Sequence, residues 1–387
     1  MKTGNILKKA FAMLMVGGMC LAACQKYELD VNFSAPEKVE GPNSVELDVT
    51  SSTPVVFTWN GGGAEDGGIV LYEVLFDTEN GDFSNPVAVF KSDLGAMKQL
   101  SLTHSQLNIM AREAGIKPET TGKFRWTVRA SKGGVVKMSG ASAFVSLTRG
   151  EGIDNIPSVL YLRGTATENN GAADLEFRTV EKGIYQIYTT FPKNGNIRFM
   201  GKAEGEENEY FFSADASGKL KEDDTAMSVS KSSEVVRITV DFNTLAVKYD
   251  EIGTEVRLIW ACNFDNVSVL KYTSNGRFAG EGDIKFVQSD RPDTNPPSWL
   301  GWVEERYYFI AQVNGGDMCW GRHDSVSAER PVGGEPASFY SLYEFAWSQW
   351  DHCWKMNGSL DMKHATITID TNKDGLMLHT FTNIKPL

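Results

Sequence analysis

The side chains of this chain best suited to binding chemistry are its tryptophans, which are unevenly spread. Of nine tryptophans, seven lie between residues 254 and 387 and none lies between residues 158 and 251. Trp299 and Trp302 fall in a loop over residues 290–302 (DRPDTNPPSWLGW), in which three prolines lower the cost of ordering the side chains. Flat aromatic rings beside hydrogen-bond donors suit the apolar faces and hydroxyls of sugars. We therefore expect this loop to bind a polysaccharide or oligosaccharide.

Two basic residues and a further tryptophan complete the expected glycan site. Lys285 precedes the loop and Arg291 is its second residue, and both are predicted to donate to sugar hydroxyls, although solvated surface charges explain them equally well. Trp320 follows a strand-like run and a Gly-Gly turn, which makes it a candidate second platform. For Trp299 and Trp302 the alternative is that at least one of them packs beneath its own loop.

The remaining candidates point to packing rather than to chemistry. Trp347, Trp350 and Trp354 recur at intervals of three and four residues, which fits a helical turn or a bulged strand, and we expect most of them in the core. Residues 158–251 offer no platform aromatic and are predicted to form a spacer. We find no acid–base, nucleophile or metal-ligand constellation, so no enzyme activity, metal or cofactor is predicted.

The elements that must position these residues are strands. Short alternating runs separated by Gly, Asn and Pro clusters predict an all-β chain of three tandem β-sandwich domains. The first block, residues 35–149, is expected to be immunoglobulin/fibronectin-III-like with one short helix, which Thr103 and Gln106 open as a capping box. The second block covers residues 158–251, and the Trp-rich third block, residues 254–387, is the candidate glycan-binding domain.

Residues 1–23 are typical of a cleavable export signal. Lys2, Lys8 and Lys9 form a basic region, followed by an apolar run too short to span a bilayer. Small residues then lead to Cys24, the position at which bacterial lipoproteins carry their lipid. We predict lipidation at Cys24, a lipid-anchored tether over residues 24–34 and a location outside the cytoplasm.

Charge and cysteine content narrow the function further. The net charge is −12, and it becomes −15 when the three signal lysines are removed (−12 − 3), which argues against binding nucleic acid. Beyond the signal and the lipid site, Cys262, Cys319 and Cys353 are expected to be buried thiols or to form one bridge. The string at residues 370–375 (DTNKDG) copies the start of a calcium loop without its later Glu, so we expect a hairpin turn.

Short motifs run through the first block in a fixed order: 57–60 (FTWN), 72–77 (YEVLFD), 80–83 (NGDF), 107–108 (LN) and 125–130 (RWTVRA). With these motifs the first block resembles the N-terminal domain of the SusE family of Bacteroidetes outer-membrane lipoproteins. The second and third blocks are similar, more loosely, to the starch-binding-like β modules of SusE- and SusF-like proteins.

The resemblance implies a non-catalytic, surface-exposed outer-membrane lipoprotein of a polysaccharide-utilisation system. Such a protein would hold starch or another glycan beside a TonB-dependent transporter and its lid lipoprotein. It also implies a platform tryptophan after the strand at residues 284–286, which is where Trp299 and Trp302 lie. The alternative is an adhesion or assembly lipoprotein that binds a protein partner such as the transporter complex, because aromatic-rich patches also mark protein interfaces.

Overall fold

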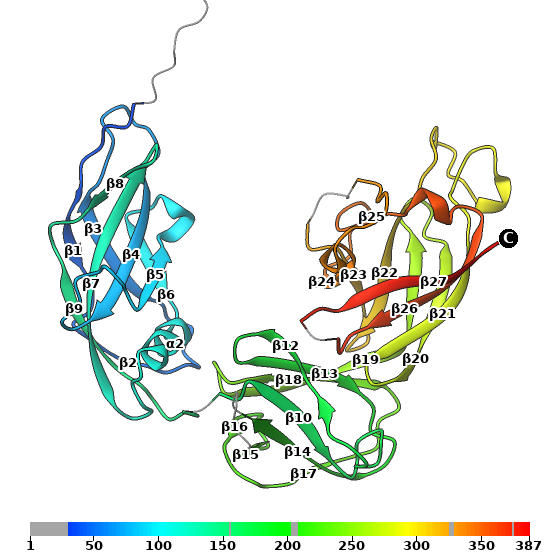
Figure 1. The fold of residues 1–387 in the computed structure, drawn as a ribbon, viewed down its shortest axis with the longest axis horizontal. Coiled ribbons are helices and arrows are strands. Elements are labelled where there is room, and N and C mark those ends of the chain that lie inside the picture. Colours follow the sequence, from blue (N-terminus) through cyan, green and yellow to red (C-terminus); the bar gives the residue numbers. More distant parts are fainter. Residues whose placement is uncertain (1–29, 155, 203–207, 325–328, 374) are drawn as a thin grey trace, which may run out of the picture. The chain divides into compact units, whose positions relative to one another are not determined.

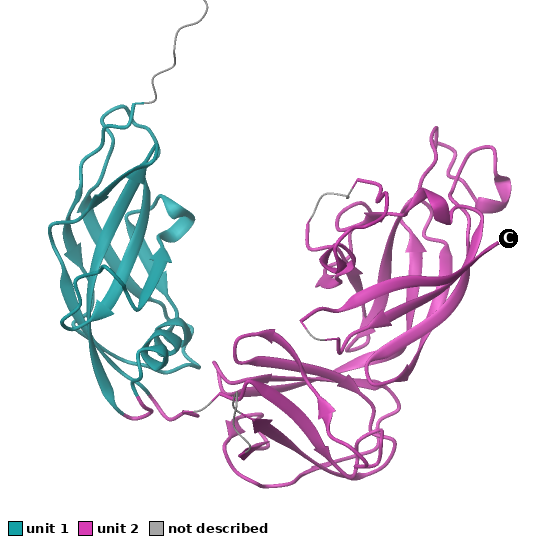
Figure 2. Cartoon of the chain, in the orientation of Figure 1, with its two compact units in different colours: residues 1–116, 120–149 teal, residues 117–119, 150–387 magenta. Residues whose placement is uncertain are grey.

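The structure is a computed structural model that describes residues 30–154, 156–202, 208–324, 329–373 and 375–387. The predicted signal peptide, Cys24 and the first part of the tether lie outside the described residues. The chain is built mostly of strands with a single α-helix among the described residues, which confirms the predicted all-β class (Figure 1). None of the helices described there is long and apolar enough to cross a membrane. Two compact units are present: residues 1–116 with 120–149, and residues 117–119 with 150–387 (Figure 2).

The first unit is a sandwich of two sheets. Its strands are β1 (Pro36–Glu40), β2 (Ser44–Glu46), β3 (Val55–Gly61), β4 (Leu71–Thr78), β5 (Ala88–Lys91), β6 (Gln99–Leu102), β7 (Thr121–Lys132), β8 (Val135–Met138) and β9 (Ala143–Thr148). One sheet has the order β1-β3-β6, and the other has the order β2-β9-β7-β4-β5 with β8 added to β7. Inward-facing aromatic rings fill the space between them, with Phe57 5.0 Å from Trp126 and 5.2 Å from Phe76.

The single helix of this unit is the predicted one. Helix α2 (His104–Glu113) starts at the N-cap Thr103, whose hydroxyl accepts from the Gln106 backbone N–H while the Gln106 side chain accepts from the Thr103 N–H. This reciprocal capping box satisfies two backbone donors that a helix start otherwise leaves unpaired. Leu107, Met110 and Ala111 face the core.

The second unit contains both later blocks. Its strands are β10 (Val159–Gly164), β11 (Leu175–Glu176), β12 (Arg178–Glu181), β13 (Ile184–Thr189), β14 (Gly195–Lys202), β15 (Glu209–Ala214), β16 (Leu220–Lys221), β17 (Met227–Val229), β18 (Val235–Asp241), β19 (Ala246–Trp260), β20 (Asn266–Ser274), β21 (Arg277–Ile284), β22 (Arg306–Val313), β23 (Gly316–Gly321), β24 (Tyr343–Phe345), β25 (Trp354–Lys355), β26 (Lys363–Asp370) and β27 (Leu378–Pro386). A smaller sheet runs β11-β10-β14-β15-β16, with β17 on β14. The larger sheet runs β12-β13-β18-β19-β20-β21-β26-β27, and β22 to β25 join it through β19.

Strand β19 runs through both blocks of the second unit (Figure 1). Its first part pairs with β18, and its second part pairs with β20 and β22. The expected junction between the second and third blocks, residues 252–253, therefore falls inside a strand. Ile252 and Val256 are fully buried on either side of the junction, whereas Thr254 and Glu255 between them are exposed. The pairing of β19 with β22 shifts register over the same residues, so the strand continues through an irregularity.

Side chains fasten the two blocks together beside this strand. The side-chain amide of Asn372 accepts from the Tyr188 N–H (2.8 Å) and donates to the Tyr188 carbonyl (2.9 Å). Glu168 accepts from the Tyr272 hydroxyl (2.9 Å) and from the Asn275 N–H (2.6 Å). Asn372 lies in the connection between β26 and β27, as the predicted hairpin turn requires.

Candidate functional site

Two loops of the third block carry three exposed tryptophan rings close to one another. Trp299 and Trp302 lie between β21 and β22 and are 50% and 54% exposed, while Trp350, between β24 and β25, is 37% exposed. The Trp299 ring centroid lies 5.9 Å from that of Trp302, with 47° between the ring planes, and 6.0 Å from that of Trp350, with 76° between the planes. We call these three residues the aromatic cluster.

The loop that carries Trp299 and Trp302 is closed at its base and anchored at its middle. Val287 and Glu304 exchange backbone hydrogen bonds of 3.0 and 2.9 Å. Leu300, between the two tryptophans, is buried, so Trp299 and Trp302 face outward on either side of it. The buried Glu304 carboxylate accepts from the Trp302 indole N–H at 2.7 Å, which fixes that ring. The alternative that either tryptophan packs beneath its own loop does not hold in the structure.

Arg306 connects this carboxylate to the third ring. Its guanidinium pairs with Glu304 at 2.7 Å, and it lies over the Trp350 ring at 5.7 Å from the centroid. A cation over an indole face stabilises both groups by about 0.5–2 kcal/mol. The charged pair thus holds two rings of the cluster from beneath.

The two predicted basic donors, Lys285 and Arg291, are engaged by carboxylates of the protein. Lys285 pairs with Asp293 at 2.8 Å, and Arg291 pairs with Asp361 at 2.8 Å. These hydrogen bonds raise the pKa of both basic side chains. The first pair joins the end of β21 to the loop, and the second joins the loop to the segment before β26. A ligand would therefore meet Lys285 and Arg291 as members of ion pairs and not as free cations.

The tip of the loop rests on a second loop, between β19 and β20. The side-chain amide of Asn263 donates to the carbonyls of Thr294 (3.0 Å) and Asn295 (3.1 Å). Asn295 has φ 49°, a left-handed conformation that asparagine tolerates better than most residues. Its side chain in turn donates to Asp265 at 3.2 Å. The loop is thereby held in one conformation from base to tip, which lowers the entropy cost of binding.

The structure places Trp320 away from this cluster, in the core. The ring is fully buried, and the rings of Tyr188 and Phe278 each lie 6.0 Å away at nearly perpendicular angles. Its indole N–H donates to Glu344 at 3.0 Å. A ring with no exposed face cannot serve as a platform, so Trp320 leaves the candidate site. It is buried because β23 turns this position toward the sandwich interior.

The structure adds exposed aromatic residues that the sequence pattern assigned to the core. Trp354 is fully buried as expected, but Trp350 joins the cluster, and Trp347 forms a second exposed pair with Phe264 at 5.9 Å. The Trp347 indole N–H donates to the Tyr308 hydroxyl at 3.0 Å. Residues 346–353 form neither a helix nor a strand. The polar residues between these tryptophans are the signal in the sequence that could have indicated a surface loop.

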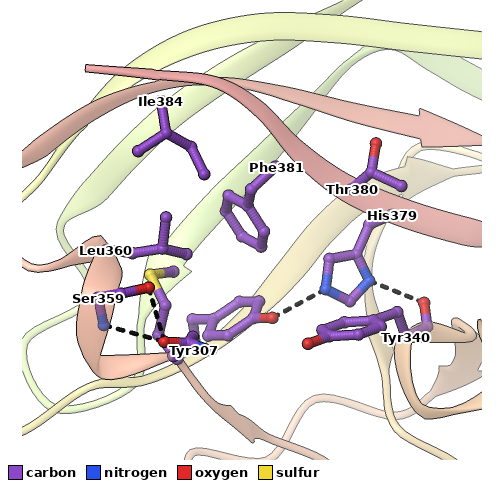
Figure 3. Close-up of a pocket in the computed structure, with 10 residues that line it drawn as sticks. Tyr307, Tyr340, Ser359, Leu360, His379, Thr380, Phe381 and Ile384 are labelled. Atoms are coloured by element: carbon purple, nitrogen blue, oxygen red, sulfur yellow. Dashed lines mark hydrogen bonds between the residues drawn. The ribbon is translucent and has the colours of Figure 1, made fainter. Parts of the chain in front are cut away.

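A cavity of about 330 Å³ lies elsewhere in the third block, beside β27 (Figure 3). Its central polar group is the fully buried His379, whose Nε2 lies 2.8 Å from the Tyr307 hydroxyl and whose Nδ1 lies 2.9 Å from the Tyr340 carbonyl. Nδ1 faces a carbonyl, so it carries the proton and Nε2 accepts from Tyr307. Burial lowers the pKa of His379 to about 3. None of the lining residues is a carboxylate or a cation, so no acid–base pair faces this cavity.

The three cysteines of the third block are free, buried thiols, which decides between the two alternatives left open by the sequence. Burial raises the pKa of Cys262 and Cys319 to about 12, and it also raises the pKa of Cys353. Thiols held in this protonated form are poor nucleophiles and poor metal ligands. Within the described residues, no group of three or more His, Cys, Asp or Glu side chains is placed to hold a metal ion.

Together, the fold and the cluster define a multi-domain β protein with an exposed aromatic surface in its third block. Residues 26–129 match the model of the family described as SusE outer membrane protein. The match confirms the resemblance predicted from the motifs of the first block, and it supports an outer-membrane protein of the Sus type. The aromatic cluster lies outside the matched residues.

Comparison with solved structures finds a similarity to the crystal structure of SusF from Bacteroides thetaiotaomicron. The identity is 11%, the alignment covers 91% of this chain and 77% of that chain, and the TM-score is 0.26. At this level no residue role and no ligand carries over from one chain to the other. Comparison with curated proteins gave no match.

Proposed function

We propose that the protein is a non-catalytic glycan-binding lipoprotein, anchored through Cys24 in the outer membrane and exposed at the cell surface. The third block holds the glycan through Trp299, Trp302 and Trp350. The three rings are between 37% and 54% exposed, and the centroids of Trp302 and Trp350 lie within 6.0 Å of that of Trp299. Glu304 holds the Trp302 indole N–H, and Arg306 lies over the Trp350 ring. Exposed aromatic patches of this kind are costly in water and mark binding surfaces.

The tilt between the rings bears on the shape of the glycan. Angles of 47° and 76° between neighbouring ring planes present a curved surface rather than a flat shelf. A glycan whose successive sugar rings turn relative to one another, as in starch, can stack on two such rings, whereas a flat ribbon-like glycan can stack on only one. Starch-like glycans are therefore the first to be tested. The match to an outer membrane protein family supports the place in the outer membrane, and the position beside a TonB-dependent transporter and its lid lipoprotein is part of the same proposal.

A glycan array probed with the full chain tests this function. We expect binding to one group of polysaccharides, and loss of retention on the matching affinity gel for Trp299→Ala and Trp302→Ala. The matched control is Phe144→Ala, which removes an exposed aromatic ring from the first unit. An array with no hits, together with co-purification of a transporter that depends on Trp299, would instead establish the aromatic cluster as a protein interface.

A further inference from the structure

A separate cavity of about 250 Å³ lies within the second unit, where strands of the second block meet residues 341–344 and 375–377 of the third. It is smaller than the roughly 300–1,000 Å³ of sites for drug-sized ligands, so an ion or a single sugar residue fills it. The polar side chains that line it are Arg178, Gln186, Tyr188, Arg237, Ser341, Tyr343 and Glu344.

Arg178 is the charge in this cavity that lacks a carboxylate partner. Its Nη2 donates to the neutral Gln186 side chain at 2.6 Å, and its Nε is buried with no acceptor. Among the described residues, no carboxylate lies within ion-pair distance of Arg178. Burial lowers the pKa of this guanidinium, although the nearby Tyr188, Tyr343 and Glu344 act in the opposite direction.

A second unpaired polar atom belongs to the same cavity. The Ser341 hydroxyl oxygen is buried and has no hydrogen-bond partner. The Nε of Arg178 and the Oγ of Ser341 are the two buried side-chain polar atoms of the second unit, within its described residues, that lack a partner. A buried polar atom without a partner destabilises the folded state, so its presence in a native protein calls for an explanation.

The neighbouring charges are already matched to one another. Arg237 pairs with Asp250 at 2.8 Å and with Glu344 at 2.5 Å, and its Nη1 also lies 3.3 Å from the Tyr188 hydroxyl. The Glu344 Oε1 that accepts from Arg237 also accepts from Trp320. Among the described residues that line the cavity, Arg178 is therefore a cation without a carboxylate in ion-pair contact, and Ser341 adds a hydroxyl without a hydrogen-bond partner.

We propose that this cavity binds a single oxyanion group, a carboxylate or a sulfate, through Arg178 and Ser341. A guanidinium donates two parallel hydrogen bonds to such a group, and a serine hydroxyl adds a third. Tyr343, 41% exposed, stands at the wall of the cavity where an attached sugar ring would pass. The oxyanion has two sources, a free ion or an acidic sugar of a glycan. This site is independent of the aromatic cluster.

Calorimetry with the full chain at constant ionic strength tests the proposal, with sodium sulfate, sodium galacturonate and neutral galactose as probes. We expect sulfate and galacturonate to bind and galactose not to bind. Equal affinity for the two anions assigns the site to a free ion, and tighter binding of galacturonate assigns it to an acidic sugar. Absence of binding by either anion at millimolar concentration would overturn the proposal, as would binding of galactose as tight as that of galacturonate.

Three variants test whether the anion binds in this cavity. Arg178→Gln is expected to weaken anion binding at least tenfold, and Ser341→Ala several-fold. Arg277→Gln, which removes an exposed arginine of the same unit, is the matched control and should bind within twofold of the wild type. Wild-type affinity in folded Arg178→Gln would refute the assignment. If that variant does not fold, unchanged affinity in Ser341→Ala would refute it instead.

Discussion

Replacing Asp250 by asparagine should destabilise the second unit in a way that depends on pH. This carboxylate is 2% exposed. It accepts from Arg237 Nη2 at 2.8 Å, from Asn314 at 2.9 Å and from Lys248 at 3.0 Å. Burial by itself raises the pKa of Asp250, but the hydrogen bonds from Asn314, Arg237 and Lys248 outweigh it and lower the pKa to about 2.

The size of the effect follows from this pKa. An aspartate in the unfolded chain has a pKa of about 3.9, so the folded state holds the ionised form more tightly by about two pH units. At 1.36 kcal/mol per unit, the ionised carboxylate contributes about 2–3 kcal/mol to folding. Because the folded pKa is the lower one, this stability is complete above about pH 4 and is lost as the pH falls toward 2. Asp250→Asn should therefore lower the free energy of unfolding by about 2–3 kcal/mol at pH 7 and flatten the dependence between pH 4 and 2.

Urea unfolding, monitored through hydrogen exchange at the backbone amides of β18 and β19, measures the change in stability of the second unit alone. Local exchange is needed because a chain with two compact units need not unfold in one transition. The control is Asp317→Asn, whose exposed carboxylate pairs with the exposed Arg257, and which should change stability by less than about 0.5 kcal/mol. If Asp250→Asn lowers the free energy of unfolding no more than Asp317→Asn does, or if its stability keeps the wild-type dependence on pH between 4 and 2, the account of the buried network is wrong.

Three further predictions use the same unfolding assay or a thiol assay. Asn372→Ala leaves the Tyr188 N–H and carbonyl unpaired and should cost about 1–3 kcal/mol, whereas wild-type stability would show that this contact is dispensable. Burial lowers the pKa of His379 to about 3, so this side chain stays neutral in the folded state while it takes up a proton in the unfolded chain below about pH 6.5. The free energy of unfolding should therefore fall by about 1.4 kcal/mol per pH unit as the pH drops from about 6.5 toward 3, and His379→Gln should remove this slope. An unchanged slope in the variant would contradict the neutral assignment. The three buried cysteines should resist a thiol reagent in the native protein and react fully in urea, and rapid native labelling would show that they are accessible.

Local signals in the sequence were sufficient for most of the fold. Alternating runs predicted the core strands, and the Thr103–Gln106 capping box predicted helix α2, because both depend on neighbours along the chain. Strands β1 and β8 were not predicted, since β1 (PEKVE) and β8 (VVKM) show no clean alternation of apolar and polar residues. The continuity of β19 was also missed, because Gly253 interrupts the sequence pattern without interrupting the strand.

The candidate site was predicted in part. The proline-rich loop indicated exposed Trp299 and Trp302, since its prolines restrict the backbone locally. Its anchoring by Asn263 and Asp361 is long-range and left no signal in the sequence. The burial of Trp320 depends on which face of β23 packs inward, and this is decided by pairing with β22. The place of Trp350 depends on a contact with Trp299, about fifty residues earlier in the chain. Neither of these long-range relations leaves a periodic signal in the sequence.

The central claim is that the aromatic cluster binds a glycan, and one calorimetric comparison tests it most directly. The full chain and its Trp299→Ala variant are titrated with the polysaccharide that the array selects. Trp299 contacts both other rings of the cluster, so its loss should weaken binding at least tenfold, about 1.4 kcal/mol or more, while the fold persists. Wild-type affinity in the folded variant would contradict the account.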